Sequence, residues 1–375
     1  MEGYENMTLF VDGKRAFPAI LSAIEGAKES LFINMFIWRD DAIGNRVAKA
    51  VLAAAERGVK VRLSVDRYGL VLEKAEEAGL SFFHKETTLA EKIKIAALML
   101  LYPQNHNGKK KDERTPLFSR ISAHPNITLE TDTFKADHSK FYVIDGETLF
   151  LGGVNIEDKE NGRDLLGREY GDYMVRIDGK DAVDAFFKKL KTGENTAQGY
   201  AFGVNTKPPN HRLFEMEERY LSLIREAERE LYITMAYFSP LPHFIRAIAD
   251  ACARGVKVSL LMPENANFQN DTNRKTARRL MKKTGGGIEL YFSPRMLHTK
   301  LVMNEKNISF GSTNITKKAF HQLSELNLFL ENKDCPLREA LLANEKALRR
   351  EAKRISSHKE IRYRRLLAAL EGFLV

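Results

Sequence analysis

One stretch of the chain occurs twice, and this repeat limits the folds open to it. Residues 24–35, IEGAKESLFINM, match residues 224–235, IREAERELYITM, and RGVKV recurs at 57–61 and 254–258. In each copy a helical pattern runs into apolar alternation, and a second helical pattern ends at a glycine before another apolar run. Alternating helices and strands predict an α/β fold, and the duplication predicts two copies of one unit.

The repeat also predicts the domain boundaries. We expect a first repeat over residues 1–200 with an insertion at about 84–135, a second repeat over 201–333, and a basic helical tail over 334–375. The insertion holds an amphipathic stretch, 89–102, followed by a polar run that contains three consecutive lysines. It is either a helix packed on the core with a solvated loop, or an element that meets a lipid surface or admits substrate.

Composition narrows the environment of the protein. The net charge of +9 favours polyanionic partners such as nucleic acid, anionic lipid headgroups or phosphorylated substrates. Two cysteines, Cys252 and Cys335, provide no disulfide framework, so we expect a reducing compartment. The sequence shows neither a secretory pattern at its start nor an apolar run of the roughly 20 residues that cross a membrane. We therefore expect a cytoplasmic protein, peripheral on a membrane surface.

Each repeat contains one His-x-Lys pair. The pairs are His138 with Lys140 and His298 with Lys300. Side chains two apart in a strand point to the same face, so each pair should present an imidazole and an ammonium group together. A single pair of this kind carries little information, but two pairs at corresponding places in a repeat predict a functional site.

A turn of small residues with an asparagine follows each pair, GGVN at 152–155 and GSTN at 311–314. Gly153 and Ser312 let the backbone approach a ligand closely, and an asparagine adds an amide donor. If the repeats pair about a pseudo-two-fold axis, two histidines, two lysines and two asparagines share one cleft. This set suits a phosphodiester: lysines and asparagines hold the phosphate, one histidine attacks phosphorus and the other protonates the leaving oxygen. Such a reaction needs no metal and no cofactor.

Carboxylates downstream of each turn are candidates to orient the histidines. Asp172 and Glu325 stand at matching positions before strand-like runs, and Glu169 is a second possibility in the first repeat. A carboxylate bonded to one ring nitrogen fixes the tautomer that leaves the other nitrogen reactive. Asp145 and Glu305 close the two motifs, and we expect structural roles for them.

At these residues the sequence resembles the phospholipase D superfamily, whose hallmark is a duplicated motif of His-x-Lys, four further residues and Asp. The first copy matches fully, and the second has Glu305 in place of the aspartate. FIWRDD at 36–41, RGVKV and GGVN are similar to bacterial cardiolipin synthases, and the resemblance spans about residues 8–332. Many of those enzymes begin with membrane-spanning helices, which this sequence does not show.

The resemblance implies two α/β/α sandwiches with one active site at their interface. It assigns His138 as nucleophile and His298 as general acid, with phosphate bound by the residues Lys140, Lys300, Asn155 and Asn314. It also implies metal-independent transfer of a phosphatidyl group between phospholipids at an anionic membrane surface. A nuclease or another phosphodiesterase with nucleic acid as partner is the alternative, and an inactive scaffold is a third. The sequence does not define the oligomeric state.

Overall fold

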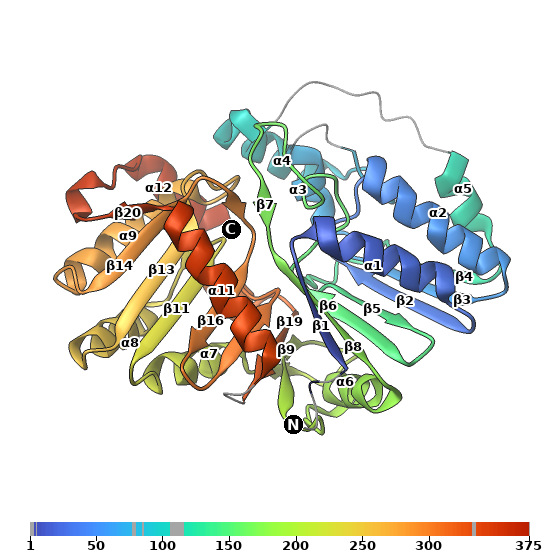
Figure 1. Cartoon of the computed structure of the whole chain (residues 1–375). Helices are drawn as coiled ribbons and strands as arrows, with labels where there is room; N and C mark the ends of the chain where they lie inside the picture. Colours follow the sequence, from blue (N-terminus) through green and yellow to red (C-terminus); the bar gives the residue numbers. More distant parts are fainter. Residues whose placement is uncertain are drawn as a thin grey trace. The chain divides into compact units, whose positions relative to one another are not determined.

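The computed structural model describes residues 4, 6–76, 80–84, 86–105, 116–331 and 335–374 (Figure 1). The chain divides into two compact units. The first unit comprises Phe10–Asp184, and the second comprises Ala185–Val375 together with Met1–Leu9. The consecutive lysines at 109–111 of the expected insertion lie outside the described residues.

The first unit is built on one mixed sheet. Its central strands β2, β3 and β4 are parallel, whereas β5 runs antiparallel to β2, and β6 and β8 continue the antiparallel pairing. Within the described residues the strand order is β1(Met7–Val11), β8(Tyr173–Asp178), β6(Thr148–Gly152), β5(Phe141–Ile144), β2(Ser30–Met35), β3(Lys60–Val65) and β4(Ile127–Glu130).

The second unit repeats this arrangement. Its parallel strands β11, β13 and β14 correspond to β2, β3 and β4, and its antiparallel strands β16, β17 and β19 correspond to β5, β6 and β8. The same order in both sheets confirms the duplicated α/β fold that the sequence predicts. Among the described residues the order is β10(Leu213–Phe214), β9(Tyr200–Thr206), β19(Glu325–Leu330), β17(Ile308–Gly311), β16(Lys300–Asn304), β11(Glu230–Met235), β13(Lys257–Pro263), β14(Ile288–Ser293) and β20(Lys353–Ile355).

Helices bury their apolar faces against these sheets. In the first unit α1(Gly13–Gly26) and α2(Ala42–Glu56) share a core with one face of the sheet, and α5(Pro116–Ala123) packs beside α2. In the second unit α7(Met216–Arg225), α8(Pro242–Ala253) and α9(Asn270–Lys283) contribute to the corresponding core. The alanine-rich sequence of α2 favours a helix, and the Asp41 carboxylate caps it by accepting from the Gly44 amide at 2.9 Å.

The remaining segments are short or lie outside these cores. The other helices are α3(Gly69–Ala75), α4(Leu89–Leu101), α6(Lys180–Thr192), α10(Lys317–His321), α11(Pro336–Glu351) and α12(Arg365–Leu374), and the 3-10 turns are η1(Pro103–Asn105) and η2(His358–Glu360). The short strands are β7(Tyr170–Gly171), β12(Phe238–Ser239), β15(Met296–Leu297) and β18(Ile315–Thr316). No helix in the described part of the chain combines the length and apolarity needed to cross a membrane.

Two sequence-based boundaries differ from the structure. The expected insertion at 84–135 includes β4, which is a core strand equivalent to β14, so the additional segment ends before it. The expected helical tail is interrupted by β20, which pairs antiparallel with β14 at the edge of the second sheet. Without β20, β14 would be an edge strand with unpaired backbone groups, and β20 pairs with them. Because β20 has only three residues, it shows no strand pattern in the sequence.

Candidate active site

The His-x-Lys segment of the first unit directly precedes β5. The sequence predicts both residues inside a strand, but the ladder starts only at Phe141, which pairs with Asn34 of β2. His138 and Lys140 are therefore placed just before the ladder, and the Lys140 carbonyl still accepts from the Gly152 amide at 3.4 Å. In the second unit Lys300 is the first residue of β16, and His298 precedes it.

His138 and Lys140 are both buried and both face the same aromatic ring. The His138 imidazole meets the Phe36 ring edge-on with centroids 4.7 Å apart, and the Lys140 Nζ lies 5.1 Å from the centre of that ring. The ammonium group also donates to the His138 carbonyl oxygen at 2.5 Å. The structure therefore brings the imidazole and the ammonium of the first unit together.

The pair in the second unit has the same local arrangement. His298 and Lys300 are buried, and the Lys300 ammonium donates to the His298 carbonyl oxygen. The His298 ring lies 6.4 Å from that of Tyr237. Each unit thus presents one buried histidine and one buried lysine at the same end of the equivalent strand.

A polar network on the other side of the first segment fixes its backbone, and sequence reasoning missed it. The Asn34 amide donates to the Ser139 carbonyl oxygen and hydroxyl, both at 3.1 Å. Ser139 in turn donates its amide to Asp137 at 3.0 Å, and Ser64 donates to Asn34 Oδ1 at 2.7 Å. Because Ser139 is tied down, the alternating residues His138 and Lys140 are held on the opposite side.

The glycine turn of the first unit makes room for a carboxylate. A Cβ atom on Gly153 would lie 2.1 Å from Asp172 Oδ2, so a larger residue would displace that side chain. Asp172 is buried, and its Oδ1 accepts from the Tyr173 amide at 2.8 Å. The position of Gly153 in the sequence is therefore explained by the carboxylate that packs over it.

The second unit solves the same contact with a hydroxyl group. Ser312 stands where the first unit has Gly153, and its Oγ donates to Glu325 Oε2. Ser312 Oγ also accepts from the Leu326 amide at 2.9 Å. Glu325 is buried at the start of β19, as Asp172 is buried immediately before β8.

The two turn asparagines are buried but differ in their bonds. Asn155 donates its side-chain amide to Glu157 Oε1 at 3.3 Å. Asn314 instead accepts from the Tyr237 amide at 3.2 Å through Oδ1. The two equivalent asparagines are thus oriented by different partners.

The acidic residues that close the motifs lie at the far end of each hairpin. Asp145 accepts from the amides of Lys28, Glu29 and Ser30, its two oxygens at 2.8–3.2 Å from the three nitrogens. Glu305 accepts from the amides at 228–230 in the same manner. Burial opposes ionisation of Asp145, but these backbone bonds outweigh it and lower its pKa, and the pKa of Glu305 is lowered in the same way. Both carboxylates tie the strand hairpin to the segment that enters the central strand.

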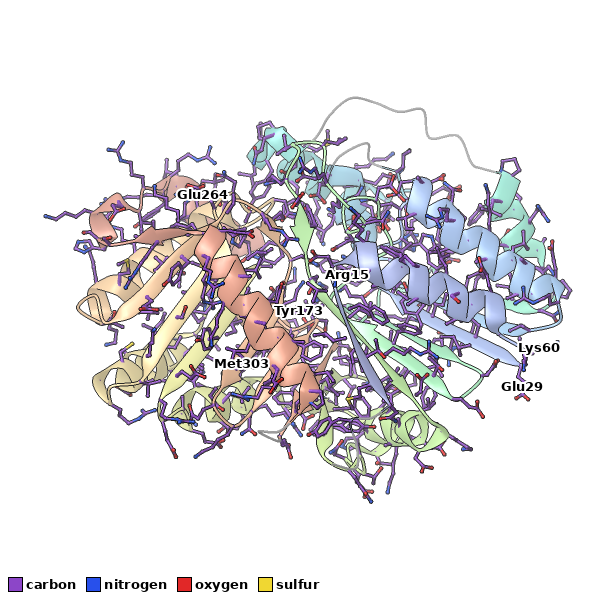
Figure 2. The ribbon with its side chains drawn as sticks, in the orientation of Figure 1. Arg15, Glu29, Lys60, Tyr173, Glu264 and Met303 are labelled. Atoms are coloured by element: carbon purple, nitrogen blue, oxygen red, sulfur yellow. The ribbon has the colours of Figure 1, made fainter. Side chains whose placement is uncertain are left out.

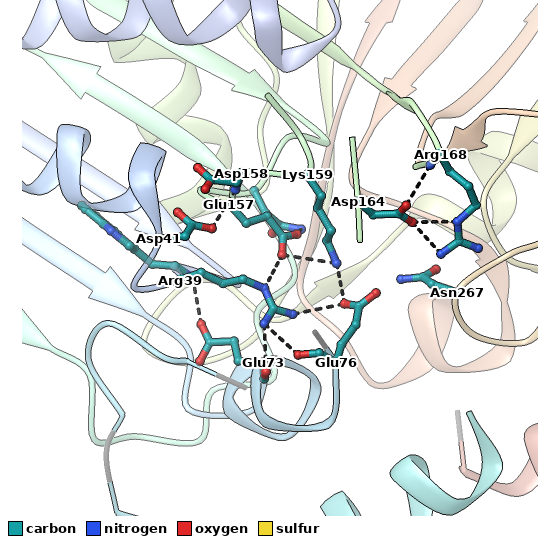
Figure 3. A network of polar contacts seen from close by, with 12 residues as sticks. Arg39, Asp41, Glu73, Glu76, Glu157, Asp158, Lys159, Asp164, Arg168 and Asn267 are labelled. Carbon is teal, nitrogen blue, oxygen red and sulfur yellow. Dashed lines mark hydrogen bonds and ion pairs between the residues drawn. The ribbon is translucent and has the colours of Figure 1, made fainter. Parts of the chain in front are cut away.

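A buried ion network lies next to the turn of the first unit (Figure 3). Arg39 Nε lies 2.7 Å from Glu157 Oε2, and its terminal nitrogen lies 3.1 Å from Glu76 Oε2. Lys159 Nζ is bonded to Glu76 and lies 3.3 Å from Glu157. Burial alone would lower the pKa of Lys159, but the two carboxylates raise it well above its ordinary value. The only sequence signal for this network is the motif FIWRDD, which contains Arg39. Nothing in the sequence identifies the carboxylates that pair with Arg39.

Two α/β units whose sheets share one order of six strands, each with a buried His-Lys pair at the start of the equivalent strand, define a duplicated fold of the phospholipase D type. A family model described as "Cardiolipin synthase, PLD-like domain" matches residues 20–192 and 220–344. The chain belongs to this phospholipase D-like family.

Individual relatives agree with this assignment. The chain is 26% identical over 351 residues to cardiolipin synthase B of Shigella flexneri, covering 87% of this chain and 76% of the relative. It is 24% identical over 347 residues to a cardiolipin synthase of Listeria innocua, covering 87% and 65%. The crystal structure of phosphatidylserine synthase from Haemophilus influenzae Rd KW20 superposes with a TM-score of 0.69 at 14% identity, covering 98% of this chain and 92% of that one. This last likeness shows the fold.

Proposed function

We propose that the protein transfers a phosphatidyl group from a phospholipid to a hydroxyl acceptor, with hydrolysis when water is the acceptor. The observation that carries the proposal is the duplicated, buried His-Lys pair. Each pair is followed by a turn whose second residue, Gly153 or Ser312, lies against a buried carboxylate, Asp172 or Glu325. Relatives named cardiolipin synthase support the choice of phospholipid as substrate.

The chemistry assigned to these residues is a double displacement. An imidazole nitrogen of His138 attacks phosphorus, the bond from phosphorus to the leaving alkoxide breaks, and His298 gives that oxygen its proton. The acceptor hydroxyl then attacks phosphorus, loses its proton to His298 and breaks the bond between nitrogen and phosphorus. The chain returns to its starting state without a metal or a redox step.

The surrounding residues stabilise charge and orient the rings. The ammonium groups of Lys140 and Lys300 neutralise the phosphate oxygens as negative charge grows, and Asn155 and Asn314 supply polar contacts together with the backbone at Gly153 and Ser312. Asp172 and Glu325 are assigned to hold the tautomers of the histidines. Asp145 and Glu305 keep the structural role that their backbone bonds support.

The site of action proposed here is the surface of an anionic membrane, with peripheral attachment. The net charge of +9 supports attraction to anionic lipid headgroups. A bilayer surface also provides both the phosphatidyl donor and a lipid acceptor at high local concentration.

The test is to incubate the purified protein with phosphatidylglycerol vesicles, EDTA and a primary alcohol, and to identify lipids by mass spectrometry. We expect a phosphatidyl alcohol or cardiolipin, lost in His138→Ala and retained in His211→Ala, which removes an exposed histidine. Intact lipid with the wild-type protein would refute phosphatidyl transfer, and cleavage of nucleic acid in its place would assign the site to a phosphodiesterase. Loss of product in EDTA alone would contradict the metal-independent mechanism.

A further inference from the structure

One helix of the first unit presents large apolar side chains to solvent. On α4, Leu89 is 75% exposed, Ile93 63% and Leu100 82%. With the exposed Ala96, these residues follow each other at spacings of four, three and four, so they share one side of the helix, and the exposed Lys92 lies three residues from Leu89 and four from Ala96 on the same side. Single exposed leucines are ordinary, but a continuous apolar stripe on one helix indicates a surface that meets an apolar partner.

The stripe belongs to a well-anchored helix. Thr88 and Glu91 form a capping box at its start, and Glu91 is paired with Arg67 at 2.9 Å. On the other side of the helix Leu98 is buried. The helix therefore has a packed face and an exposed apolar face, which is the arrangement of an interfacial helix.

The stripe lies at the same end of the sheet as His138. β2 and β3 are parallel, so their final residues lie at one end of the sheet, and α3 and α4 follow β3 in the chain. His138 lies at this same end, because it precedes β5, whose first residue pairs with Asn34 near the end of β2. Glu29 and Lys60 mark the opposite end, where β2 and β3 begin (Figure 2). Residues on α4 and the histidine are thus carried by the same edge of the first unit.

A row of aromatic rings connects the exposed surface at this end with His138. Phe134 is 54% exposed, and its ring centre lies 4.9 Å from that of Tyr68. Tyr68 lies 5.9 Å from Phe36, and Phe36 lies 4.7 Å from His138. Tyr68 directly follows Arg67, the residue that anchors α4. A series of contacting aromatic rings therefore leads from the exposed Phe134 to the buried imidazole.

We infer that the exposed stripe of α4, defined by Leu89, Ile93 and Leu100, docks on an anionic phospholipid bilayer and places its lipids at the entrance to His138. The inference rests on the proposed function for the identity of the lipid. Lys92 lies within the stripe and Lys94 beside it, both exposed. Their stems can lie along the acyl region while their ammonium groups reach anionic headgroups. A second copy of the chain would instead bring the lysines of both copies into one interface, so charge complementarity favours the bilayer.

The first experiment uses a tryptophan reporter. The chain has one tryptophan, Trp38, which is buried in the core of the first unit. In vesicles of phosphatidylglycerol and phosphatidylcholine with brominated acyl chains, we expect strong quenching of Leu100→Trp and no change in wild-type emission. Glu147→Trp, in the turn at the opposite end of the sheet, is the matched control and should not be quenched. Absence of quenching in Leu100→Trp would overturn the inference.

A second experiment measures the strength of docking. In a vesicle sedimentation assay, the triple variant L89S/I93S/L100S should bind anionic vesicles with about 100-fold lower affinity, because it loses the burial of three apolar side chains in the bilayer. K92E/K94E should weaken binding to phosphatidylglycerol vesicles by roughly tenfold. Circular dichroism and the unfolding midpoint should match the wild type, since the altered side chains are exposed.

The outcomes separate the docking surface from the proposed activity. Docking needs no turnover, so quenching of Leu100→Trp without any lipid product would support the surface and refute phosphatidyl transfer. Lipid product with unchanged binding of the triple variant would support the transfer and overturn the surface. A blue shift of Leu100→Trp that follows protein concentration without vesicles would assign the stripe to self-association and also overturn it.

Discussion

The two units place a lysine at the same point of the repeat but surround it differently. Lys159 and Lys318 each stand four residues after the turn asparagine. In the first unit Lys159 contacts Glu76 and Glu157, and its pKa is raised. In the second unit Thr316 takes the place of Glu157, and its hydroxyl caps α10 by accepting from the Ala319 amide at 3.1 Å. Burial lowers the pKa of Lys318 to about 8.

The difference teaches that a duplicated fold retains its strand order while its buried charges change. The second unit places a buried ion pair elsewhere, on α11, where Arg349 lies 2.6 Å from Glu345 and donates to Ser259 at 2.6 Å. A buried charge is costly without a partner, so each unit needs its pairs, but the backbone does not dictate where they lie. The His-Lys pairs are the reverse case, because both units keep them at the start of the equivalent strand.

The largest expected effect tests whether the two histidines are interchangeable. His138→Ala should lower turnover by about 100- to 10,000-fold on any phosphodiester, because the proposed nucleophile is removed. His298→Ala should cause a similar loss on a lipid substrate but a much smaller loss on a p-nitrophenyl ester, whose leaving group needs no proton. Steady-state rates on both substrates provide the measurement. Equal losses of the two variants on the nitrophenyl ester would contradict the division of roles.

A second comparison concerns the paired lysines. Lys159→Met should lower the free energy of unfolding by about 3–5 kcal/mol, because Glu76 and Glu157 would remain buried with one cation fewer. Lys318→Met should cost far less, since the folded state already disfavours its charge. Urea unfolding at pH 7 provides the measurement, with the exposed Lys14→Met as control. A similar cost at both lysines would show that their surroundings are energetically equivalent.

Much of this arrangement could be predicted from the sequence because it repeats or follows a period. The duplicated α/β unit follows from the duplicated apolar pattern, and His138 and Lys140 could be chosen because the same pair returns at 298–300. The ion pair between Arg39 and Glu76 could not be predicted, because the two residues come from different segments and only the folded backbone brings them together. For the same reason the hydrogen bond from Asn34 to Ser139, which are 105 residues apart, could not be predicted. Short β20 has no recognisable period at all.

The smallest expected effect is a pH dependence that separates the two lysines. The pKa of Lys318 is about 8 in the folded state against 10.5 for an ordinary lysine, so between these values the unfolded state binds more protons. Stability of the wild type should therefore rise with pH across this window, so the cost of Lys318→Met should be smallest below pH 8, where the wild type buries a charge, and should grow toward pH 10.5. Lys159, whose pKa is raised above 10.5, stays protonated in both states until about that pH. The cost of Lys159→Met should consequently remain constant over the same window. Unfolding midpoints of both variants, measured from pH 7 to 10.5, check the contrast, and a flat difference for Lys318→Met would show that burial does not suppress its charge.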